Sequence, residues 1–60
     1  MAIYNVTYTC YEKGTSNVVS EGTMPINTSS AYLAEETVKA MFNGTEVMIR
    51  YTENAWLTIN

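Results

Sequence analysis

Apolar and polar residues alternate strictly near the start of the chain. The apolar positions there are Tyr4, Val6, Tyr8 and Cys10. Alternation of β-branched and aromatic residues with polar ones is typical of a strand that has one buried face. The pattern therefore predicts a strand over residues 2–12, with the even-numbered side chains toward the core and Tyr11 on the opposite face.

A turn and a second strand follow. Residues 13–17 are turn formers and include Gly14, while residues 18–24 read as a strand that returns antiparallel to the first. Pro25 has no N–H to donate to a strand ladder, so we expect this strand to end near residue 24. Within it, Gly22 indicates either a bulge or a point where the helix approaches closely.

The middle of the chain has helical periodicity. Apolar side chains on one side of a helical wheel are Ala31, Ala34, Val38, Met41 and Phe42. We expect the N-cap at Ser29, with Thr28 as the second choice, because both side chains can accept a backbone N–H. Gly44 is the expected left-handed residue at the end. The sequence thus predicts a helix over residues 30–42 with one buried face.

The last part of the chain predicts a hairpin. Residues 45–52 read as a third strand, residues 53–54 as a turn and residues 55–59 as containing a fourth strand. A loop over residues 53–55 keeps the apolar side chains of this hairpin on one side of the sheet, as the period of two requires. That expected core-facing set is Val47, Ile49, Tyr51, Leu57 and Ile59.

The predicted element order is ββαββ in a single domain over residues 1–60. One helix can cover only one face of a four-stranded sheet, so we expect an α+β, two-layer sandwich with a mainly antiparallel sheet and one open face. The strand order stays open. One option places parallel first and last strands in the centre, as in the β-grasp of immunoglobulin-binding bacterial domains, which share only the element order.

The open face of the predicted hairpin collects residue types that favour protein interfaces. It carries Glu46, Met48, Arg50, Trp56 and Thr58. The chain has a single Trp and a single Arg, and Trp, Arg and Met are enriched where proteins bind one another. We therefore predict partner binding through Trp56, Arg50, Met48 and Tyr11. The alternative is that Trp56 only covers the sheet, with Arg50 stacked on it as a cation–π pair.

The composition argues against an enzyme. No His and one Cys leave no zinc ligand set and no imidazole base for a nucleophile. Cys10 lies on the predicted core face, where a small buried apolar residue is expected. The six acidic residues are all Glu at expected exposed or turn positions. We expect no catalytic residue, no metal, no cofactor and no small-molecule substrate.

Charge and hydropathy limit the partners further. The net charge is −3, and the three cations Lys13, Lys39 and Arg50 are scattered, whereas nucleic-acid binding requires clustered Lys and Arg. No apolar run approaches the roughly 20 residues of a membrane span. The N-terminus lacks the features of a signal peptide, and one Cys fits a reducing compartment. We expect a cytoplasmic protein without a membrane or nucleic-acid partner.

Three segments resemble small phage-encoded accessory proteins. These are Tyr4-Asn5-Val6-Thr7-Tyr8, Ser29-Ser30-Ala31-Tyr32-Leu33-Ala34-Glu35-Glu36 and Val47-Met48-Ile49-Arg50-Tyr51. A phage-encoded inhibitor of bacterial RNA polymerase has a similar β-β-α-β order, although none of its site residues is matched here. The resemblance implies a short accessory protein in the host cell cytoplasm that binds a host or phage protein.

The sequence therefore favours a small non-enzymatic binding module of phage or mobile-element type. It would bind or inhibit a protein through the open sheet face or a strand edge. One alternative is a structural homo-oligomer, such as a homodimer whose sheets self-associate. A second alternative is a nucleic-acid-binding protein that stacks bases on the aromatic sheet face.

Overall fold

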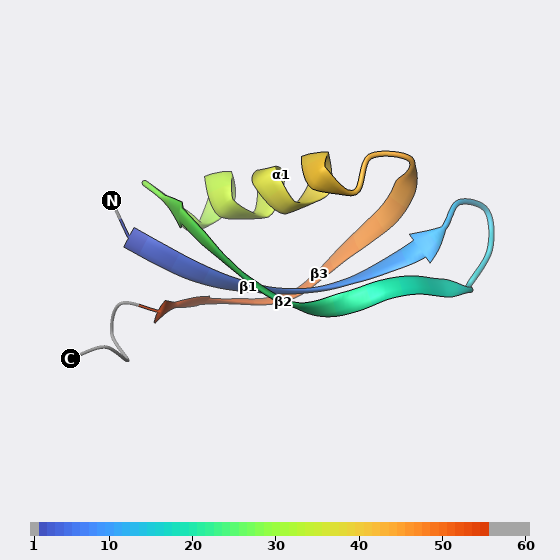
Figure 1. Ribbon diagram of the computed structural model, residues 1–60, viewed down its shortest axis with the longest axis horizontal. Helices are drawn as coiled ribbons and strands as arrows, with labels where there is room; N and C mark the ends of the chain where they lie inside the picture. The colour runs from blue at the N-terminus through green and yellow to red at the C-terminus, as the bar shows by residue number, and fades with distance from the viewer. Residues whose placement is uncertain (1, 56–60) are drawn as a thin grey trace.

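The structure, a computed structural model, describes residues 2–55. Its elements are β1 (Ala2–Glu12), β2 (Val18–Thr28), α1 (Ala31–Met41) and β3 (Thr45–Asn54). Figure 1 shows α1 lying along one face of a twisted sheet. The chain has an α+β fold with the order β-β-α-β.

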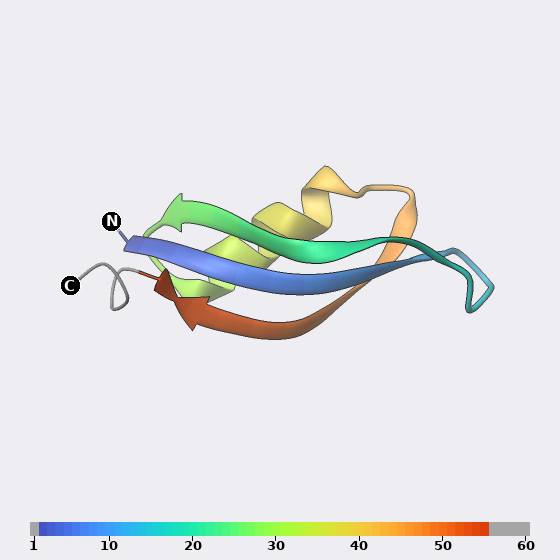
Figure 2. The same ribbon diagram turned by 60° about the horizontal axis from the view of Figure 1, so that its bottom comes forward.

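The sheet is antiparallel throughout, with the strand order β2-β1-β3. Figure 2 shows β1 between its two neighbours, with α1 behind them. The first strand of the chain is therefore the central one. This differs from the option of two parallel central strands.

The predicted ββαββ order with a four-stranded sheet is wrong, because the described chain forms three strands. Residues 53–54 were expected to turn, yet Glu53 pairs with Asn5 and Asn54 pairs with Tyr4 on β1. The long central strand offers backbone partners up to that point, so β3 gains ladder hydrogen bonds by continuing. Most of the predicted fourth strand, residues 56–59, lies outside the described residues.

The core lies between β1 and α1, as the alternation and the helical periodicity predicted, but the predicted place of Met41 on the buried side of the helix is wrong, because 56% of it is exposed. Its buried members are Val6, Tyr8, Cys10, Ala34 and Val38. From β3, Val47 and Ile49 pack against this cluster. The ring of Tyr8 lies on that of Phe42, with the centroids 4.9 Å apart. Cys10 is a buried free thiol, as expected.

β2 continues past Pro25 to Thr28, so the predicted end near residue 24 is wrong. Pro25 pairs with Asn5. A proline fits a strand at the edge of a sheet, where its nitrogen can face away from the neighbouring strand. β2 is such an edge, which explains how the strand can continue through Pro25.

Gly22 marks neither a bulge nor an approach of the helix. It pairs in regular register with Tyr8, and a Cβ added at Gly22 would lie 3.7 Å from the Tyr8 hydroxyl oxygen. The bulge in this hairpin lies further along, where the register passes over Val19.

The helix begins one residue later than predicted. Ser30 is the N-cap, and its Oγ accepts a hydrogen bond from the Leu33 N–H at 3.2 Å. Ser29 serves instead as the bend that leads out of the lengthened β2. At the other end the Phe42 N–H donates to the Val38 carbonyl, and Gly44 has the expected positive φ, +100°.

Candidate protein-binding face

The sheet face opposite α1 is the candidate site, and we call it the outer face. The strand registers assign to it Ile3, Asn5, Thr7, Thr9, Tyr11, Val18, Glu21, Thr23, Pro25, Asn27, Glu46, Met48, Arg50, Tyr51 and Glu53. No described helix or strand covers it (Figures 1 and 2). Its surface is therefore set by side chains of the three strands alone.

A bulge in β3 shapes the outer face. Tyr8 pairs with Ile49 and Thr7 pairs with Tyr51, so Arg50 is an extra residue in β3. A bulge of this kind shifts the alternation of side chains by one position. Tyr51 therefore lies on the outer face, where 58% of it is exposed. The prediction that Tyr51 faces the core is wrong.

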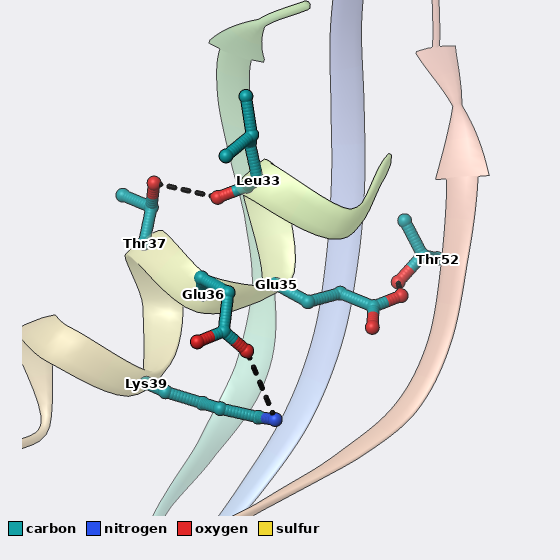
Figure 3. Close-up of polar contacts among 6 residues, drawn as sticks. All are labelled: Leu33, Glu35, Glu36, Thr37, Lys39 and Thr52. Atoms are coloured by element: carbon teal, nitrogen blue, oxygen red, sulfur yellow. Dashed lines mark hydrogen bonds and ion pairs between the residues drawn. The ribbon is translucent and has the colours of Figure 1, made fainter. Parts of the chain in front are cut away.

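The same bulge turns Thr52 toward the helix. The Thr52 hydroxyl donates a hydrogen bond to Oε2 of Glu35 at 2.7 Å. Figure 3 shows Glu35 reaching from α1 to Thr52 on β3. This contact fixes one side of α1 over β3 beyond the bulge.

Arg50 and Met48, two of the predicted binding residues, lie together on the outer face. Nε of Arg50 donates to Oγ1 of Thr9 at 3.3 Å, and Nη1 donates to Sδ of Met48 at 3.3 Å. Thr9 is only 5% exposed, although no described backbone element covers its face. The Arg50 side chain is thus held over the central strand.

Tyr11 lies on the same face, further toward the β1–β2 turn. It pairs with Glu46 on β3, and it is half-buried. Trp56 lies outside the described residues, as does the predicted stacking of Arg50 on it. The structure therefore places three of the four predicted binding residues on one face.

Three carboxylates lie on the same face as the single arginine. Among the described residues, Glu21, Glu46 and Glu53 share the outer face with Arg50. Oε1 of Glu46 accepts the Gly14 N–H at 3.0 Å, which ties the β1–β2 turn to the start of β3. The charge of the face is mixed, with acid in excess.

Two threonines pair across β1 and β2 on the outer face. The hydroxyls of Thr7 and Thr23 lie opposite each other and share a hydrogen bond of 2.9 Å. The short, paired side chains keep this part of the face low and polar. Met48, Arg50 and Tyr51 are the larger side chains that β3 adds to the face, beside Tyr11 on β1.

Sequence reasoning missed Tyr51 and the burial of Thr9. Strict alternation through residue 52 gave no sign of a bulge. A signal would have come from extending the strand further, because unbroken alternation puts Glu53 on the core face, and a charge there is costly. The bulge returns Glu53 to the outer face.

The described residues contain no group of three or more possible metal ligands and no pocket. The described part of the chain also has no helix of a length and hydropathy that would cross a membrane. Comparison with protein-family models, curated proteins and solved structures found no match for the chain. The resemblance to phage-encoded proteins therefore stays a prediction, and the function is argued from the geometry.

Proposed function

We propose that this chain is a small non-enzymatic protein-binding module of phage or mobile-element type, which binds or inhibits a host or phage protein through its outer face. One observation carries the proposal. The bulge at Arg50 gathers Met48, Arg50 and Tyr51 on a sheet face that no described element covers. Met, Arg and Tyr are the types enriched in protein interfaces relative to other surfaces.

The arginine is prepared for binding. Its contacts with Thr9 and Met48 hold the side chain in one place before any partner arrives. A side chain that is already ordered loses less conformational entropy on association. The remaining N–H groups of the guanidinium suit a carboxylate or a backbone carbonyl of the partner.

The charges of the face favour a protein over a nucleic acid. A phosphate backbone on this face would meet three glutamates, Glu21, Glu46 and Glu53, and one arginine. Binding to nucleic acids depends on neutralising several phosphates at once. A protein surface with mixed charge fits the outer face better.

Affinity capture tests the proposal with the full chain and a lysate of the cells from which the chain comes. The baits are the natural chain, an Arg50→Ala/Tyr51→Ala double variant, and a Tyr32→Ala control, which changes an exposed side chain on α1. We expect one protein in about equimolar amount with the natural chain and the control, and its loss with the double variant. Recovery of that protein by the double variant, or of no protein by the natural chain, would overturn the proposal.

A further inference from the structure

A second surface lies along the free edge of β2. Pro25 has no N–H for β1 and fits the ladder only with its nitrogen facing away from that strand. Backbone N–H groups point alternately to the two sides of a strand. Glu21 and Thr23 pair with β1 in unbroken register with Pro25. Their N–H groups therefore point to the free edge, where no described strand pairs with β2.

An apolar flank of α1 borders this edge. Glu35 marks the side of the helix that faces β3. Figure 3 shows Leu33 and Thr37 on the other side, toward β2. Met41 follows Thr37 by one helical turn on that same side. Leu33 is 44% exposed and Met41 is 56% exposed.

We propose that a second copy of the chain binds this edge, with the two β2 strands pairing antiparallel about a two-fold axis perpendicular to the sheet. Two sheets of three strands would then form one of six, with both helices on the same face. Such an interface is self-complementary, because each edge supplies donors and acceptors to an identical edge. This surface is separate from the outer face.

The helices favour a second copy over an unrelated strand. α1 packs on all three strands, so its axis lies near the central strand β1. Three strand spacings separate the two central strands of the dimer, which is about 14 Å. Packed helices lie roughly 8–10 Å apart. The Leu33 and Met41 side chains of both copies are suited to fill the difference.

The edge carries little that would prevent pairing. Natural edges that stay unpaired are protected by charges, prolines or covering elements. In β2 the bulge at Val19 and Pro25 bound a regular segment, residues 20–24, in which the charged residue is Glu21. A register that pairs Glu21 of each copy with Thr23 of the other avoids opposing carboxylates and leaves Pro25 at the end of the paired segment.

The small core gives the second copy a physical role. Among the described residues, those with no solvent exposure are Val6, Cys10, Ala34 and Val38. A chain of this length buries only about 60% of its unfolded surface. Without a disulfide or a structural metal, domains of this size are often stabilised by oligomerisation. Burial of Leu33 and Met41 would enlarge the apolar core.

Sedimentation equilibrium of the full chain over a range of concentrations tests the proposal. We expect a monomer–dimer equilibrium whose Kd rises at least about 10-fold for Leu33→Lys and for Glu21→Pro. Tyr32→Lys is the matched control, because it makes the same change at the neighbouring exposed residue, about 100° around the helix. It should leave Kd within about 2-fold.

A fourth variant tests the edge in the opposite direction. Pro25→Thr restores an N–H at the free edge, so it should tighten the dimer. Circular dichroism confirms that each variant is folded. A monomer at all concentrations would overturn the proposal, as would a dimer that responds to Arg50→Ala/Tyr51→Ala but not to Leu33→Lys. Capture of a partner by the outer face should survive Leu33→Lys, so the two proposals fail separately.

Discussion

Nε of Arg50 donates a hydrogen bond to Oγ1 of Thr9, a residue 41 positions earlier in the chain. The bond joins β3 to the central strand on the face that α1 leaves open. It also explains why Arg50, an extra residue in the strand register, keeps a defined place above the sheet. The candidate binding face therefore depends on a bulge and on one threonine.

Thr9→Val should disturb the position of the Arg50 side chain without a large effect on the stability of the fold. Valine keeps the shape and the strand preference of threonine but offers no acceptor to Nε. We expect the free energy of unfolding in urea to change by less than about 1 kcal/mol. Partner binding should weaken, because Arg50 must then be ordered on association. Thr9→Ser, which keeps the hydroxyl, is the control and should bind as the natural chain does.

The bulge predicts opposite roles for two residues that flank it. Ile49 packs against the core and Tyr51 lies exposed on the outer face. Ile49→Ala should lower the free energy of unfolding by about 2 kcal/mol or more. Tyr51→Ala should lower it by less than about 1 kcal/mol. Urea denaturation measures both losses. A loss for Tyr51→Ala as large as that for Ile49→Ala would mean that both side chains face the core and that the strand alternates without a bulge.

The helix start is open to a similar paired test. Ser30 accepts the Leu33 N–H, whereas Ser29 lies in the bend before it. Replacement of Ser30 by Ala should cost about 1 kcal/mol of stability through the lost cap. Ser29→Ala should lower the free energy of unfolding by only a few tenths of a kcal/mol. Thermal denaturation of the two variants distinguishes the sites, and equal losses would disprove the placement of the cap.

Two glycines should differ in their tolerance of a side chain. Gly44 has φ +100°, where an L residue is strained, so Gly44→Ala should destabilise the fold by about 1 kcal/mol or more. At Gly22 a Cβ meets the Tyr8 hydroxyl at an ordinary contact distance. Gly22→Ala should therefore change stability by less than about 1 kcal/mol. Chemical denaturation of both variants checks the order.

Local pattern predicted the parts of the fold that local forces decide. The alternation of β1, the burial of Ala34 and Val38 on one side of α1 and the glycine at position 44 all had the expected outcome. These features depend on neighbours in the sequence, so the sequence carries them directly.

The remaining features depend on residues far apart in the chain. β3 continues through Glu53 because the start of β1 lies beside it. Pro25 stays in a strand because β2 is an edge, and strand order is not written in a local pattern. The bulge at Arg50 lets Val47 and Ile49 face the core while Glu53 lies on the outer face. The need for a bulge becomes visible in the sequence only if the strand is known to continue to Glu53.

The most direct test of the outer face is the affinity of the captured protein, once purified, for the natural chain and for Arg50→Ala/Tyr51→Ala. We expect calorimetry to show a loss of at least about 30-fold for the double variant, as for residues central to an interface. Tyr32→Ala should bind within about 2-fold of the natural chain. Equal affinities of the natural chain and the double variant would contradict a binding site on the outer face.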